Sequence, residues 1–236
     1  MLKQRGFSLT ELMIGSAVGL IVVAGAVQLY LLNLRATADN LRLSRLNQEL
    51  RATLDLLQND LRRAGYWSFI PVVDNPADNP FQSDGNRLRL GHAPGEEDDS
   101  CILYSYDANA DGRVGVGAAG TPSLTASTAN LEQFGFRLRN GQVQMRNGGS
   151  VFDCRSGSWQ NVTDPDTEIT ALHFTLTETC RNLLDPDATC GSGDPALLQR
   201  RVAIAIDGRS RSDSRVHQQL TSMVAIANDL LLAAYP

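Results

Sequence analysis

The sequence predicts an α+β fold in which one long amino-terminal helix packs on an antiparallel β-sheet domain. Two observations support this prediction. Apolar residues fill positions 7–32 and then continue as a stripe of leucines at helical spacing. The rest of the chain instead alternates polar and apolar residues in short runs that are bounded by turn-forming residues. A helix with one apolar stripe buries it against another layer, and a sheet with one apolar face provides that layer.

The apolar run over residues 7–32 contains a single charged residue, Glu11. About 20 apolar residues are enough to cross a bilayer, and the segment must be helical because lipid offers the backbone no hydrogen-bond partners. The positive charges Lys3 and Arg5 precede the run, and no second run follows. This distribution predicts a single-pass inner-membrane protein with a cytoplasmic amino terminus and a domain on the opposite side of the membrane.

The helix is predicted to continue beyond the bilayer as far as about residue 64, with Gly65 as its stop, because no proline occurs before Pro71. Leucines recur at steps of three and four along one face, and charged residues occupy the other faces. The leucines are Leu43, Leu46, Leu50, Leu54, Leu57 and Leu61, and the charged residues are Arg42, Arg45, Glu49, Arg51, Asp55, Asp60 and Arg62. We expect this stripe to pack on the globular domain.

Strands are predicted in two groups, after an irregular, proline-containing loop over residues 66–84. Asn140 and Gly141 stand between two of the predicted strands and are typical of a tight hairpin turn. The first group covers residues 86–91, 101–106, 133–139 and 142–146, and the second covers residues 169–178, 200–207 and 217–227.

The four cysteines are expected to lie outside the cytoplasm, where disulfides persist. None forms a C-x-x-C pair, which argues against a zinc ribbon or a thioredoxin-type site. Three connectivities are possible. We favour Cys101 with Cys154 and Cys180 with Cys190, because the second pair closes a short loop rich in turn formers. Free buried cysteines are the alternative.

Residues Gly6, Phe7 and Glu11 form a pattern that resembles the type IV pilins and the pseudopilins of type II secretion. The resemblance implies cleavage by a prepilin peptidase after Gly6, N-methylation of Phe7, and pairing of Glu11 with the freed amino group of a neighbouring subunit. The implied organisation is a leader at 1–6, a helix at 7–64 whose residues 7–32 span the membrane, and a β-rich domain at 65–236. In the alternative interpretation the segment is a plain anchor and Glu11 reaches the membrane interface.

The segment from Cys101 to Trp159 resembles minor pilins of the PilW type, which are related to the J-type pseudopilin. This resemblance implies a role in priming pilus assembly, a position near the fibre tip, and final location in a surface fibre. The implied partners are other minor pilins, the major pilin, the prepilin peptidase, the inner-membrane assembly platform, a tip adhesin, and membrane lipid before assembly. A type II secretion pseudopilin and a signal-anchored periplasmic binding or enzymatic domain are the alternative functions.

The residues Asp107, Asn109 and Asp111, followed by Gly112, resemble the first half of an EF-hand calcium loop. The second half is missing, because glycine and alanine stand where further ligands belong. A carboxylate from elsewhere would have to complete the shell, and the candidates are Glu132, Glu96, Glu97, Asp98 and Asp99. The competing interpretation is a turn in which aspartate and asparagine side chains bond to their own backbone.

No catalytic pattern is present, so we expect no enzymatic activity and, apart from possible calcium, no cofactor. His92, His173 and His217 show no metal-ligand spacing, and the sequence has no nucleophile elbow, phosphate loop or dinucleotide fingerprint. The formal net charge is −5 and becomes two units more negative when Lys3 and Arg5 leave with the leader. An acidic chain of this kind is not expected to bind nucleic acid.

Overall fold

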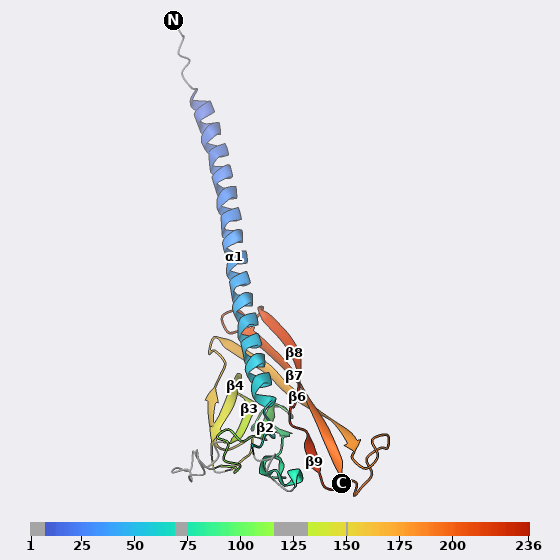
Figure 1. Cartoon of the computed structure of the whole chain (residues 1–236). Coiled ribbons are helices and arrows are strands. Elements are labelled where there is room, and N and C mark those ends of the chain that lie inside the picture. The colour runs from blue at the N-terminus through green and yellow to red at the C-terminus, as the bar shows by residue number, and fades with distance from the viewer. Residues whose placement is uncertain (1–7, 69–74, 116–131, 150) are drawn as a thin grey trace. The chain divides into compact units, whose positions relative to one another are not determined.

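The computed structural model describes residues 8–68, 75–115, 132–149 and 151–236 (Figure 1). The chain divides into two compact units, residues 1–44 and 45–236, which are taken separately below. The helix α1 (Leu9–Leu61) contributes to both units. It is the long helix that the sequence predicts, and it ends three residues before the predicted boundary at residue 64.

In the first unit α1 is a membrane-type helix. An 18-residue window within α1 has a mean hydropathy of 2.2, and none of that window is buried in the structure. Its large apolar side chains are exposed, including Leu12 at 68% and Ile21 at 72% of their surface. A helix that is apolar on all sides is stable in lipid or among other apolar helices rather than in water. This agrees with the membrane segment predicted from the sequence.

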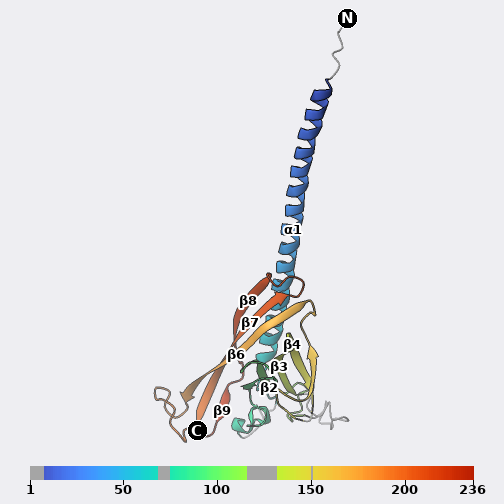
Figure 2. The ribbon, with the colours of Figure 1, turned by 180° about the vertical axis from the view of Figure 1, so that it is seen from behind.

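The second unit contains two antiparallel sheets, which lie side by side along the carboxy-terminal part of α1 in both Figure 1 and Figure 2. The first sheet has the order β1 (Arg89–Gly91), β2 (Cys101–Ser105), β3 (Gln133–Arg139), β4 (Gln142–Gly148) and β5 (Ser158–Asn161). The second has the order β6 (Thr167–Asn182), β7 (Ala196–Ser210) and β8 (His217–Ala225), with β9 (Leu230–Leu232) paired to β7. Two short 3₁₀-helices, η2 (Pro76–Asp78) and η3 (Pro80–Gln82), lie in the predicted irregular loop.

One core joins the helix to both sheets. Leu50 and Leu57 of α1 have no exposed surface. The same cluster contains Ile102 and Phe136 of the first sheet and Ile204 of the second. The leucine stripe therefore packs on the sheets as predicted, except for Leu43, which is 41% exposed. The α+β layout expected from the sequence is confirmed.

Asp60 departs from the prediction that places it on a solvent-facing side of the helix. Only 6% of its surface is exposed, and its carboxylate accepts hydrogen bonds from the hydroxyls of Tyr104 and Tyr106 on and just after β2. Arg63 pairs with the same carboxylate. Burial, followed by the charge of Asp60, raises the pKa of both tyrosines. The helical pattern misses Asp60 because only the fold brings two tyrosine hydroxyls and an arginine to it.

Two predicted turns have the expected geometry. Gly65 has φ +77° after the last turn of the helix, and its N–H donates to the Ser105 carbonyl at 2.7 Å. A Cβ at this position would lie 2.6 Å from Gln82 Nε2, so the Gln82 side chain would have to move, and the positive φ itself favours glycine. Asn140 and Gly141 both have positive φ and connect β3 to β4, as a two-residue hairpin of primed type requires.

The β topology differs from the prediction. Strand β1 covers residues 89–91 instead of 86–91, and β8 ends at residue 225 instead of 227. The strands form two sheets instead of one, β5 and β9 are additional, and β6 and β7 extend beyond their predicted ends. The extensions pair with each other, and the β7 extension also pairs with β9. The β6 extension at residues 179–182 is polar and gives no apolar alternation, whereas Ala196 and Leu198 of β7 are buried. The disulfide Cys180–Cys190 lies at this extended end, and Cys101–Cys154 attaches β2 to the loop before β5. Both are the pairings favoured from the sequence.

Candidate functional site

Two regions hold the residues that the sequence marks as functional. The first is the amino-terminal segment. Gly6 and Phe7, the predicted cleavage and methylation positions, lie outside the described residues. Glu11 stands in the first turn of α1, and its Oε2 accepts a hydrogen bond from the Ser8 N–H at 3.0 Å. A glutamate side chain that bonds to the backbone N–H three residues earlier satisfies one of the unpaired N–H groups at the helix start. Its negative charge also interacts favourably with the positive, amino-terminal end of the helix dipole.

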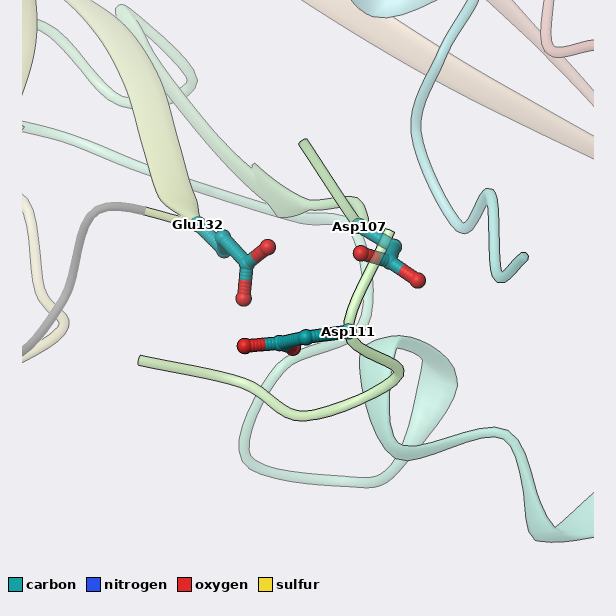
Figure 3. A group of neighbouring side chains, drawn as sticks. All are labelled: Asp107, Asp111 and Glu132. Carbon is teal, nitrogen blue, oxygen red and sulfur yellow. The ribbon is translucent and has the colours of Figure 1, made fainter. Parts of the chain in front are cut away.

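The second region is a cluster of three carboxylates, Asp107, Asp111 and Glu132, shown in Figure 3. One oxygen from each side chain lies within 4.8 Å of the others. Asp107 and Asp111 belong to the loop that follows β2, and Glu132 immediately precedes β3. Because β2 and β3 are paired antiparallel, with Ser105 opposite Gln133, the residues that follow one and precede the other meet at the same end of the sheet.

Asp107 is held rigidly in this cluster. Only 3% of its surface is exposed, and its Oδ2 accepts hydrogen bonds from the Ser68 N–H at 3.2 Å, the Gly112 N–H at 3.1 Å and the Ser68 hydroxyl. Its other oxygen, Oδ1, is buried and has no hydrogen-bond donor in the described part of the chain. The indole of Trp67 fastens the same loop by donating to the Gly112 carbonyl at 3.2 Å.

Glu132 is the most deeply enclosed member of the cluster, with 1% of its surface exposed. Its Oε1 accepts from the N–H groups of Ala108 and Asn109, and its Oε2 from that of Gly115. Burial raises the pKa of Glu132 to about 7, and the charges of Asp107 and Asp111 add to the rise, against the lowering effect of the backbone donors. The raised pKa of Glu132 shows that its ionised form is disfavoured in this enclosed position, and a bound cation would offset that cost.

Within residues 8–68, 75–115, 132–149 and 151–236, no arginine, lysine or histidine forms an ion pair with these three carboxylates. Oxygen ligands of this kind favour hard cations such as Ca²⁺ or Mg²⁺.

The structure selects Glu132 among the carboxylates that the sequence offers to complete the loop. The acidic run at 96–99 does not belong to this cluster. Glu96 accepts from the Asn140 N–H, and Asp98 pairs with His92 at 3.0 Å. The Asn109 side chain forms hydrogen bonds within its own loop. Its Oδ1 accepts from the Asp111 N–H, and its Nδ2 donates to Asp111 Oδ2. The turn-forming interpretation therefore describes Asn109 correctly.

The three histidines do not form a site. His173 and His217 are exposed residues of β6 and β8, and His92 lies before β2. Sequence spacing had already argued against a histidine metal site. Sequence analysis missed the buried network of Asp60, Tyr104 and Tyr106. The only local signal for it is that Asp60 lies beside the last residue of the leucine stripe, which is too weak to predict a buried network.

Comparison with known proteins gives two family matches. Residues 39–226 match the family described as prepilin peptidase-dependent protein B, and residues 1–27 match the prokaryotic N-terminal methylation motif. The similar proteins include the prepilin peptidase-dependent protein B of Escherichia coli (strain K12), 25% identical over 167 residues, or 71% of this chain and 74% of that protein. An uncharacterised protein of Haemophilus influenzae is 27% identical over 108 residues, which cover 43% of this chain and 45% of that protein. No solved structure matches the chain.

Proposed function

We propose that this chain, which belongs to the prepilin peptidase-dependent protein B family, is a minor pilin of the PilW type that primes or joins a type IV pilus. One observation carries the proposal. A methylation motif over residues 1–27 and a prepilin peptidase-dependent family over residues 39–226 occur in the same chain, and together they cover most of it. In this proposal the protein is a structural subunit, and the chemistry at its amino terminus is carried out by the peptidase.

Processing is proposed at the Gly6–Phe7 bond, followed by N-methylation of Phe7. The positions fit the motif, because Gly6 ends the basic leader and Phe7 opens the apolar run. Before assembly the apolar part of α1 would anchor the chain in the inner membrane. The domain would then lie on the periplasmic side, where the two disulfides can form and persist.

Glu11 is proposed to guide docking into the fibre. A carboxylate among apolar helices is costly unless a cation approaches it, and the amino group that cleavage creates on Phe7 of a neighbouring subunit is such a cation. Methylation leaves that amine positively charged. In the isolated chain, Glu11 Oε2 accepts a hydrogen bond from the Ser8 N–H. This contact is compatible with a second partner at the other carboxylate oxygen of Glu11.

The experiment that tests the processing step is mass spectrometry of the amino terminus, on protein from cells with and without the prepilin peptidase. We expect a methylated Phe7 terminus in the first strain and an intact Met1 start in the second. An intact Met1 in both strains would reduce residues 7–32 to a plain anchor and contradict the pilin proposal. Recovery of the processed chain with a type II secretion apparatus, rather than in pili, would favour the pseudopilin alternative.

Replacement of Glu11 with glutamine is expected to leave cleavage intact and to lower incorporation of the chain into sheared fibres by about tenfold or more, because the neutral side chain cannot pair with the amine. The measurement compares the fibre and membrane fractions by immunoblot. Glu11→Asp keeps the charge and should retain more incorporation than Glu11→Gln. Glu97→Gln, at an exposed position of the domain, is the control and should behave as the unmodified chain. Equal incorporation of Glu11→Gln, Glu11→Asp and the control Glu97→Gln would contradict the docking role of Glu11.

A further inference from the structure

We propose that Asp107, Asp111 and Glu132 bind one calcium ion, which fastens the loop after β2 to the start of β3. This goes beyond the proposed assembly role, which assigns no part to a metal ion. The proposal rests on the geometry of the three carboxylates, on one unpartnered buried oxygen, and on the chemistry of the donor set.

The spacing of the carboxylates suits a single ion. Calcium holds oxygen ligands at about 2.3 to 2.6 Å, so two ligands of one ion lie at most about 5 Å apart. The three ligand atoms of this cluster lie within 4.8 Å of one another. Figure 3 shows the three carboxylates converging, with Glu132 approaching from the start of β3 and the two aspartates from the facing loop.

The second observation is the buried Oδ1 of Asp107. The other oxygen of this carboxylate accepts from Ser68 and Gly112, whereas Oδ1 is enclosed and has no donor among the described residues. Asp107 is 97% buried, since only 3% of its surface is exposed. Buried polar atoms in native proteins nearly always have a partner, and an unpaired buried carboxylate oxygen is costly. A cation between Asp107 and Glu132 would provide that partner.

The donor set selects calcium over other metals. The cluster offers three carboxylates and no histidine or sulfur ligand, which disfavours zinc and other soft or borderline metals. Calcium accepts irregular coordination and completes its shell with backbone carbonyls and water, whereas magnesium demands a near-octahedral shell. The loop supplies only part of an EF-hand ligand set, so the affinity expected is that of extracellular calcium modules, with Kd about 10⁻⁴ to 10⁻³ M.

The position of the cluster determines what the ion would do. The loop at 107–115 contacts the segment after the helix through Ser68 and Trp67, and Glu132 begins the strand paired to β2. An ion held by both would connect the end of the helix, the loop and the first sheet. Calcium would therefore stabilise the domain against unfolding, and the stabilisation would weaken when any one of the three carboxylates is neutralised.

The test is calcium titration of the full-length protein in detergent, followed by thermal unfolding. We expect about 10 mM Ca²⁺ to raise the unfolding midpoint by several degrees, with half of the effect near millimolar concentration, and the same concentration of Mg²⁺ to raise it less. Asp111→Asn and Glu132→Gln should each weaken the apparent affinity at least about tenfold. Glu97→Gln, in the exposed acidic run, is the matched control and should leave the titration unchanged.

A wild-type midpoint that does not respond to about 10 mM Ca²⁺ would overturn the proposal. An equal response of wild type, Asp111→Asn and Glu132→Gln would overturn it as well, because the ion would then bind elsewhere. A second readout does not depend on the folding of these two variants. Tb³⁺ replaces Ca²⁺ and emits light when a nearby indole is excited, and the Trp67 indole contacts the loop at Gly112.

Terbium emission from the wild-type chain should be quenched by competing Ca²⁺ and lost in Trp67→Phe. It should persist in Trp159→Phe, because Trp159 packs against the Cys101–Cys154 disulfide instead. Emission that depends on Trp159 and not on Trp67 would place the metal ion away from the three carboxylates and contradict the proposal.

Discussion

Replacement of Leu57 with aspartate is expected to unfold the globular domain, whereas the same replacement at the adjacent Leu56 is expected to be tolerated. Leu57 has no exposed surface and lies in the core between the helix and both sheets, but Leu56 is 40% exposed. Loss of a buried leucine side chain costs about 2 to 5 kcal/mol, and a buried carboxylate adds several more. That sum is comparable to the whole free energy of unfolding of a typical domain, about 5 to 15 kcal/mol.

The two positions make a matched comparison, because both changes remove a leucine from the same helical turn and carry the same loss of helix propensity. The measurement is far-ultraviolet circular dichroism and limited proteolysis of the full-length protein in detergent, with Leu57→Ala as an intermediate step. We expect Leu57→Ala to lower the unfolding midpoint and Leu57→Asp to abolish the cooperative transition. Equal damage from Leu56→Asp and Leu57→Asp would contradict the packing of the leucine stripe.

Removal of the Cys101–Cys154 disulfide is expected to destabilise the domain more than removal of Cys180–Cys190. The first links residues 53 positions apart and the second links residues 10 apart. By the loop-closure relation, the longer loop contributes about 4 kcal/mol and the shorter about 3 kcal/mol. The longer one is also buried and packs with Leu103, Phe152 and Trp159, whereas the shorter one is half-buried at the end of the extended β6–β7 ribbon.

Chemical denaturation of the two double-alanine variants, Cys101→Ala with Cys154→Ala and Cys180→Ala with Cys190→Ala, measures this difference. We also expect the first variant to accumulate less in cells, since an opened core exposes apolar surface to proteases. The shorter loop serves as the control for the loss of any disulfide. A larger effect from the Cys180–Cys190 pair would show that the extended ribbon, and not the core around Cys101, limits stability.

Local patterns were sufficient for much of the fold. The apolar run and the leucine steps place the helix, because a helix repeats its contacts every three to four residues. Asn140 and Gly141 place a hairpin, since both adopt positive φ at little cost. Sequence separation and turn residues also favoured the cysteine pairs that the structure contains. In each of these cases the structure depends on residues that are close in sequence, or on cysteines, which can form a covalent bond with each other.

Other features depend on partners that lie far apart in sequence. The sequence pattern predicts Asp60 to be a surface residue, but the fold brings the hydroxyls of Tyr104 and Tyr106 into hydrogen-bond contact with its carboxylate. The strands divide into two sheets that share one core with the helix, and no local period in the sequence encodes that division. The outer part of β6 is polar and has no apolar alternation, so its extent depends on its pairing with β7, whose own outer end also pairs with β9.

The candidate site shows the same division. The sequence by itself predicted that Asp107 and Asp111 stand in a turn that resembles the first half of a calcium loop, because their spacing and the following glycine are local. It also determined the amino-terminal motif and the apolar helix. Only the tertiary structure decided that Glu132, rather than the acidic run at 96–99, joins the aspartates, because the antiparallel pairing of β2 and β3 brings residues 21 and 25 positions apart in the chain to one end of the sheet.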